Sequence, residues 1–139
     1  MTEPLNLYAV LHAAHAVEEE VEAKLNAIGL SGAKLAALRA LSDAGESLPL
    51  SQLADRLSCV KSNITQLVDR LEADGFVARR ADPRDRRARL AALTSAGRKA
   101  VKDGTRVFEV AERDVFSRLS RDEAHQLHAL LGKMRSSTT

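Results

Sequence analysis

The sequence contains no tryptophan, one cysteine and few aromatic residues, which make up 3% of its 139 residues. So low an aromatic content disfavours an all-β fold, because strands favour aromatic and β-branched residues. The single cysteine, Cys59, excludes an intrachain disulfide and cannot by itself form a tetrahedral zinc site. The sequence also lacks a signal-peptide pattern and any apolar run of about 18 residues, so we expect a cytoplasmic protein with no membrane contact.

The overall composition is typical of one soluble helical domain. Hydrophobic residues make up 45% and charged residues 29% of the chain. Its length suffices for one folding unit with one core. Neither a glycine-rich phosphate loop nor a nucleophile elbow is present, and no histidine is evidently paired with the cysteine. We therefore predict that the protein is not an enzyme and needs no cofactor.

Positive charge is concentrated in the middle of the sequence, although the formal net charge is only +2. Between Arg56 and Lys102 there are 12 Lys and Arg against 5 Asp and Glu, whereas the rest of the chain carries 9 against 14. A basic segment inside a nearly neutral protein is typical of a protein that binds nucleic acid.

Hydrophobic periodicity predicts a mainly helical chain. Apolar residues recur at three- and four-residue steps over six segments, and a capping residue stands at the expected helix starts Ser31, Thr94 and Ser120. The predicted helices cover residues 5–25, 32–44, 51–57, 61–73, 95–119 and 121–135. Only three residues separate the third helix from the fourth, which is the arrangement of a helix-turn-helix unit.

A basic hairpin is expected directly after this unit. Residues 76–80 and 88–93 have the pattern of two short strands, and the polar segment 81–87 between them contains a proline. Six arginines and two aspartates lie between Arg79 and Arg89. The expected fold is therefore mainly α with a small β-hairpin wing, in the α+β class.

The residues of this region resemble the winged helix-turn-helix of the MarR family. Segment 57–77, Leu-Ser-Cys-Val-Lys-Ser-Asn-Ile-Thr-Gln-Leu-Val-Asp-Arg-Leu-Glu-Ala-Asp-Gly-Phe-Val, is similar to that family's recognition helix, and the wing is similar at Arg79, Arg80, Asp85, Arg86, Arg87, Leu93 and Thr94. The resemblance implies a DNA-binding region over residues 31–94 and a helical dimerisation region over residues 1–30 and 95–139. It also implies a homodimer and a small-molecule inducer.

Polar residues on the outward face of helix 61–73 are the candidates for reading DNA. An α-helix fits the major groove, where side chains that donate and accept hydrogen bonds read base edges. Lys61 and Arg70 are expected to bind phosphates, with pairing to Asp85 of the wing as the alternative role of Arg70. The alternative for the whole face is ordinary solvation. The candidates for base contact are Ser62, Asn63, Thr65 and Gln66.

The arginines of the hairpin are the candidates for a minor-groove contact. Clustered arginines suit the strongly negative potential of a narrow minor groove. We expect Arg87, at the wing tip, to enter the groove, with Arg84 and Arg86 on flanking phosphates beside Asp85. The alternative is a solvated cluster of charge.

Two further sets of residues are candidates for sensing a signal. Cys59 precedes helix 61–73, where the helix dipole and Lys61 favour the reactive thiolate, and a small buried residue is the alternative. Histidines three residues apart on a helix are compatible with a metal ion, but we favour interface or surface histidines and predict no metal site. These histidines are His12 and His15, and His125 and His128.

Together these features predict a sequence-specific, double-stranded DNA-binding transcriptional regulator. The predicted form is a homodimeric repressor of a palindromic operator, released by a small ligand or by thiol oxidation. A two-fold dimer presents two recognition helices to half-sites about one turn of DNA apart. Two alternatives stay open: a non-specific architectural DNA-binding protein, and a winged-helix module that binds another protein.

Overall fold

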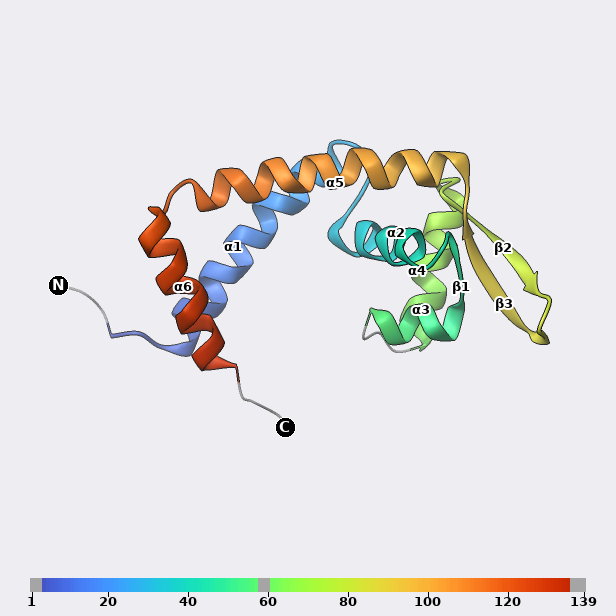
Figure 1. Ribbon diagram of the computed structural model, residues 1–139, viewed down its shortest axis with the longest axis horizontal. Helices are drawn as coiled ribbons and strands as arrows, with labels where there is room; N and C mark the ends of the chain where they lie inside the picture. Colours follow the sequence, from blue (N-terminus) through green and yellow to red (C-terminus); the bar gives the residue numbers. More distant parts are fainter. Residues whose placement is uncertain (1–3, 58–60, 136–139) are drawn as a thin grey trace.

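The computed structural model describes residues 4–57 and 61–135. In chain order the elements are α1 (Leu7–Asn26), α2 (Gly32–Asp43), β1 (Ser47–Pro49), α3 (Leu50–Arg56), α4 (Lys61–Ala73), β2 (Val77–Asp82), β3 (Asp85–Leu93), α5 (Ser95–Phe116) and α6 (Arg121–Met134). Figure 1 shows the elements from α2 to β3 gathered under one end of α5, with α1 and α6 toward its other end. The predicted mainly helical fold with a small hairpin wing is confirmed. In the described part of the chain, no helix is both long and apolar enough to cross a bilayer.

Local signals in the sequence determine where three of the helices begin. The side chains of Ser31, Thr94 and Ser120 each accept a hydrogen bond from a backbone N–H three residues further on. Glu123 completes a capping box, because its Oε1 accepts the backbone N–H of Ser120 at 2.8 Å. These bonds satisfy donors that the first turn of a helix leaves unpaired, and they confirm the three predicted helix starts.

The sheet contains one strand more than the sequence predicted. Its antiparallel order is β1-β3-β2, so that β3 lies in the middle, and Leu48 of β1 pairs with Ala91 of β3. β1 is only three residues long and ends in proline, so it carries no alternating pattern that would reveal it. Its strand conformation depends on a neighbour that lies far along the chain.

The strands of the hairpin are longer than predicted and its turn is shorter. Strand conformation continues to Asp82 and Asp85 and leaves a two-residue turn, but the register shifts between Ala81 and Asp82, so that residues 86–88 of β3 have no partner on β2. Each aspartate stabilises this end through its own side chain: Asp82 Oδ1 accepts the N–H of Arg84, and Asp85 Oδ1 accepts the N–H of Arg87, both at 2.9 Å. The arginines of this end, Arg84, Arg86 and Arg87, are exposed.

The hydrophobic core lies between α2, α3, α4 and the sheet. Leu38, Leu53 and Val68 from the three helices are fully buried. No described large hydrophobic side chain between residues 31 and 94 is exposed. Each fully buried leucine or valine stabilises the fold by about 1.5–3 kcal/mol relative to exposure, so this part of the chain is stabilised by its own packing.

The first turn of α5 lies directly against the backbone that connects α4 to β2. The hydroxyl of Thr94 donates to the Gly75 carbonyl oxygen at 2.6 Å, and the backbone N–H of Thr94 donates to the Phe76 carbonyl oxygen at 3.0 Å. A Cβ atom at Gly97 would collide with that same Phe76 oxygen. We call these contacts of Gly75, Phe76, Thr94 and Gly97 the α5 joint. Glycine at position 97 allows the close approach on which the joint depends.

We expect Gly97→Ala to lower the free energy of unfolding by about 1–3 kcal/mol, because the backbone must shift to admit the methyl group. Chemical denaturation followed by circular dichroism measures the change. The matched control is Gly132→Ala in α6, where no atom lies within 4 Å of the added Cβ. Alanine has the higher helix propensity, so the control should be neutral or stabilising. Equal destabilisation by both substitutions would contradict the packing role of Gly97.

Candidate nucleic-acid interface

Helix α4 exposes a polar stripe that matches the predicted DNA-reading face. Asn63, Gln66 and Arg70 are exposed and recur at steps of three and four residues, which places them on one side of the helix. The opposite side packs into the core through Ile64, Val68 and Leu71. The spacing of apolar residues along α4 therefore buries one side of the helix and leaves its hydrogen-bonding side chains in solvent.

Some of the predicted site residues lie at or before the start of α4. Lys61 and Ser62 begin the helix, but their side chains are outside the described residues, as is Cys59. Thr65 is also exposed, but it lies beside the stripe of Asn63 and Gln66 and is not part of it. The roles assigned to these residues stay predictions.

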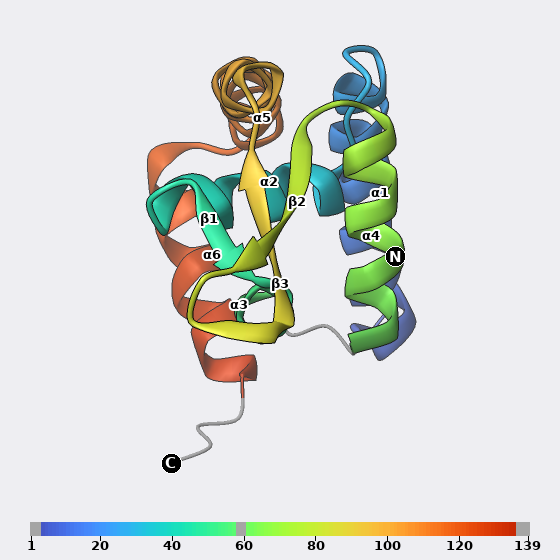
Figure 2. The same ribbon diagram turned by 90° about the vertical axis from the view of Figure 1, so that its right-hand side faces the viewer.

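The wing, the hairpin formed by β2 and β3, lies beside α4 (Figure 2). Arg84 occupies the turn, whereas Arg86 and Arg87 are in β3, and all three are exposed. Regular pairing ends at Ala81 and Arg89, beyond which the register shifts, so all three arginines belong to the irregular far end of the wing. That Arg87 enters a DNA groove stays a prediction.

Arg79 of β2 connects the wing to α4 through a contact that the sequence did not predict. Its Nη2 lies 2.6 Å from Asp69 Oδ1 and its Nη1 lies 3.0 Å from Glu72 Oε1. The second oxygen of Glu72 accepts the backbone N–H of Arg79 at 3.1 Å. Nη2 also donates to the backbone carbonyl oxygen of Thr65 at 3.3 Å. One side chain thus joins three successive turns of α4 to the first strand of the wing.

The alternative predicted for Arg70 was a pair with Asp85 that would join α4 to the wing, and Arg79 makes that connection instead. Within the described residues Arg70 forms no ion pair with Asp85, whose Oδ1 accepts the N–H of Arg87. Asp69 and Glu72 are three residues apart on α4, so they share one side of the helix. That spacing is visible in the sequence, but which arginine pairs with the two carboxylates depends on how closely β2 approaches α4.

Away from the winged part, many apolar side chains remain exposed. No described residue of α6 is buried, and four of its apolar residues at positions three and four apart form one face: Leu127, Leu130, Leu131 and Met134. Further exposed apolar residues on α1 and α5 are Leu7, Tyr8, Leu11, Val17, Val110 and Phe116. Uncovered apolar residues in this number, on α6 and on parts of α1 and α5, are typical of a protein interface.

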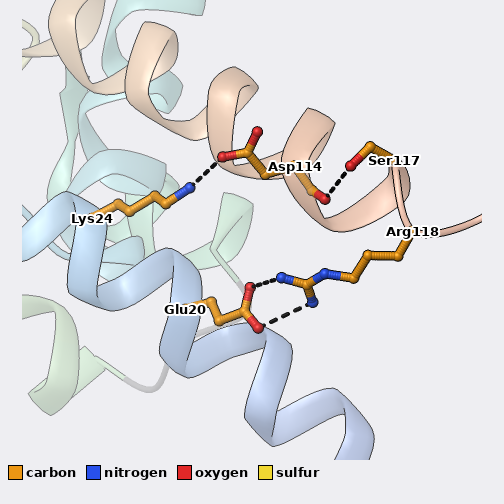
Figure 3. Close-up of polar contacts among 5 residues, drawn as sticks. All are labelled: Glu20, Lys24, Asp114, Ser117 and Arg118. Carbon is orange, nitrogen blue, oxygen red and sulfur yellow. Dashed lines mark hydrogen bonds and ion pairs between the residues drawn. The ribbon is translucent and has the colours of Figure 1, made fainter.

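Two ion pairs fix α1 against the C-terminal part of α5 (Figure 3). Lys24 Nζ lies 2.7 Å from Asp114 Oδ2, and Arg118, just beyond α5, contacts both oxygens of Glu20 at 3.1 and 2.7 Å. The hydrogen bond from Arg118 holds the pKa of Glu20 below its ordinary value, and the one from Lys24 does the same for the pKa of Asp114. These pairs set the direction of α1 and therefore of its exposed apolar residues.

The four histidines are exposed side chains of α1 and α6. His15 Nε2 lies 3.1 Å from Glu19 Oε1, one helical turn further on. Within residues 4–57 and 61–135, no group of three or more His, Cys, Asp and Glu side chains is arranged to bind a metal ion. His12, His125 and His128 therefore have no ligand set within the described chain.

Comparison with known proteins connects this architecture to one family. The MarR family model matches residues 28–88. The chain is 34% identical over 130 residues to the HTH-type transcriptional regulator YkoM of Bacillus subtilis, covering 93% of this chain and 84% of the relative. It is 29% identical over 129 residues to the HTH-type transcriptional repressor Rv2887 of Mycobacterium tuberculosis, covering 93% and 92%. The crystal structure of the S. aureus MepR–DNA complex matches with a TM-score of 0.82 at 27% identity, covering 97% and 99%.

We expect the stabilisation from the Glu20–Arg118 pair to disappear in acid. Because the pKa of Glu20 is lowered in the folded protein, the pair contributes stability above the ordinary glutamate pKa, and this contribution is lost as the pH falls below about 4. Thermal unfolding of the protein and of Glu20→Gln should differ near neutral pH and converge as the pH falls through the lowered pKa of Glu20. The pair is exposed, so high salt should also reduce the difference. A difference that persists in acid would contradict this origin.

Proposed function

The chain belongs to the MarR family of transcriptional regulators, and from this premise we propose that it is a homodimeric repressor of a palindromic operator in double-stranded DNA. The observation that carries the proposal is the exposed polar stripe of α4 beside an arginine-rich wing (Figure 2). A helix of this kind fits the major groove, and a basic hairpin next to it suits the adjacent minor groove.

We assign base reading to the polar side chains of α4. The amides of Asn63 and Gln66 can each pair with adenine through two hydrogen bonds. Ser62 and Thr65 are assigned the same role from their positions in the sequence. Arg70 is exposed and has no acidic partner among the described residues, so we assign it to a phosphate. Lys61 at the helix start is assigned the same role from its position in the sequence.

The wing is assigned to the minor groove and its flanking phosphates. Arg84 at the turn is the residue that we expect to enter the groove, because it extends furthest along the hairpin. Arg86 and Arg87 are exposed in the irregular part of β3 next to the turn, and we assign them to the phosphates that flank the groove. Asp85 stabilises the turn through the N–H of Arg87 and is not assigned to DNA.

A second copy of the chain is the proposed cover for the exposed apolar faces of α1, α5 and α6. The winged part, residues 31–94, buries its large apolar side chains within one chain, whereas residues 1–30 and 95–139 contain all of the described large apolar side chains that are exposed. This contrast supports the division into a DNA-binding and a dimerisation region. Two copies related by a two-fold axis would present their α4 helices to half-sites about one turn of DNA apart.

Repression is proposed because the Mycobacterium tuberculosis relative is named a repressor. Release from DNA is proposed to follow binding of a small ligand or oxidation of Cys59. A crevice of about 230 Å³, lined by Ile28, Leu30, Phe76 and the first turns of α5, supports the ligand route. It is smaller than the roughly 300–1,000 Å³ of drug-sized sites, so it would admit only a small molecule.

The central test is selective DNA binding. A duplex enriched from random sequence by the purified protein should bind at least about 10³-fold more tightly than a scrambled duplex in fluorescence anisotropy. Gln66→Ala should lose about 1–3 kcal/mol on the enriched duplex and little on the scrambled one, because it removes a base contact. Equal binding of the unmodified protein to both duplexes would overturn sequence-specific repression in favour of the architectural alternative.

Arg86→Ala, which removes a proposed phosphate contact, serves as the matched control for Gln66→Ala. It should weaken binding to both duplexes and reduce the slope of log affinity against log salt by about 2, because a dimer carries two wings. Repeating the titration with an oxidant, and with Cys59→Ser, separates the two release routes. Oxidant-induced loss of binding that the variant resists supports the thiol route, and binding unaffected by oxidant supports a small ligand.

Dimerisation is tested on the apolar face of α6. Leu130→Glu should convert the dimer to a monomer in sedimentation experiments, because the charge would be buried against the partner. The winged part should keep its cooperative unfolding, since α6 contributes no buried residue to it. The matched control is Ala129→Glu, which is exposed on the opposite side of the same helix and should remain dimeric. A dimer that persists in Leu130→Glu would contradict the assignment of this face.

A further inference from the structure

We propose that Arg79 is a positioning residue for DNA recognition: it fixes the angle between the wing and α4 so that both reach their grooves together. The proposal rests on the proposed function, because the angle matters only for a protein that reads DNA through both elements. No direct contact of Arg79 with DNA is part of it.

The contacts of Arg79 differ from those of every other arginine in the wing. Its side chain is 22% exposed, and it binds Asp69, Glu72 and the Thr65 carbonyl oxygen of α4. Arg80, Arg84, Arg86, Arg87 and Arg89 are exposed and form no ion pair within the described residues. One arginine of six is therefore committed to the protein itself, and the other five face solvent.

The position of Arg79 near the base of the wing amplifies any movement toward the tip. About four residues separate it from the turn, which corresponds to roughly 13 Å at the rise of an extended strand. A tilt of roughly 15° at Arg79 would move the tip by roughly 3.5 Å, which is about one base step along DNA. Loss of the contact would thus let the wing meet the wrong phosphates while α4 stays in register.

Arg79 also neutralises two carboxylates on the side of α4 that faces the wing. Asp69 and Glu72 are 59% and 44% exposed, in the space between the recognition helix and the hairpin. Unpaired, they would repel a DNA backbone that passes between the two elements. The guanidinium of Arg79 therefore has two effects. It fixes the wing against α4, and it keeps the surface between them compatible with a DNA backbone.

The test uses the full-length protein, the enriched duplex and the scrambled duplex, and measures their affinity ratio. The double variant Asp69→Asn/Glu72→Gln releases Arg79 and removes two negative charges per chain. We expect scrambled DNA to bind more tightly, because the surface becomes more positive, and the affinity ratio to fall by at least about tenfold. If both duplexes gain affinity in parallel and the ratio is unchanged, Arg79 is only one more cation and the proposal is overturned.

Arg79→Met and Arg80→Met form the matched pair of single variants. Each removes one positive charge from neighbouring positions of β2, but only the first breaks the contact with α4. Arg79→Met should reduce the affinity ratio, whereas Arg80→Met should weaken both duplexes alike. An unchanged ratio in Arg79→Met would overturn the proposal. If the ratio falls in the double variant but not in Arg79→Met, Asp69 and Glu72 themselves contribute to base reading. Arg79→Lys keeps the charge without the two-pronged geometry, so it should restore binding to scrambled DNA but not the ratio.

Footprinting separates positioning from general destabilisation. In Arg79→Met, protection of major-groove guanines from methylation should persist, while hydroxyl-radical protection at the wing position spreads or shifts. Unchanged protection in both grooves would also overturn the proposal. If the unsubstituted protein shows no preference between the duplexes, the proposed function fails. If the unsubstituted protein is selective and its Arg79 variants are equally selective, only the positioning role of Arg79 fails.

Discussion

The α5 joint is the contact on which the geometry of the whole molecule depends. Thr94 and Gly97 at the start of α5 meet the backbone of Gly75 and Phe76, where α4 has just ended and the wing begins. The recognition helix, the base of the wing and the long helix that leads to the apolar faces are therefore tied within a few residues. Because α1 and α6 lie toward the other end of α5 (Figure 1), the direction of α5 sets where the recognition helix would lie relative to the proposed partner subunit.

In the basic segment between Arg56 and Lys102, the acidic and the basic side chains have different roles. All five of its acidic residues hold the protein's own structure: Asp69 and Glu72 bind Arg79, Asp74 binds Lys34 at 2.7 Å, and Asp82 and Asp85 accept backbone N–H groups at the turn. Most of the arginines have no such partner among the described residues. The local excess of positive charge is thus left at the surface, on the wing and the outer face of α4, where a polyanion can neutralise it.

The sequence predicted those features that depend on neighbouring residues. Helix starts at Ser31, Thr94 and Ser120 follow from capping within three residues, and the buried and exposed sides of α4 follow from spacing along one helix. It failed where a distant segment decides the outcome. β1 is a strand because β3 lies beside it, and the role of Arg79 depends on the approach of β2 to α4.

The far end of the wing also depends on more than the local sequence. Composition marks the segment from residue 81 to 87 as polar, and polar segments between strands are usually turns. Here the side chains of Asp82 and Asp85 accept nearby backbone N–H groups, and strand conformation continues past a register shift after Ala81 to a two-residue turn. A side-chain to backbone bond of this kind is short in sequence, but its effect on strand length depends on the pairing register that the rest of the sheet imposes.

Helix α6 has the weakest support within one chain, and this links folding to assembly. It has a capping box but no buried residue, and an isolated helix of its 14 residues is only marginally stable in water. Its apolar face gains stability only when another surface covers it, so association would stabilise α6 and the exposed parts of α1 and α5 together. A second copy would then supply both the free energy that orders these helices and the second recognition helix. In such a system dimerisation and DNA binding strengthen each other by linkage, because each favours the arrangement that the other requires.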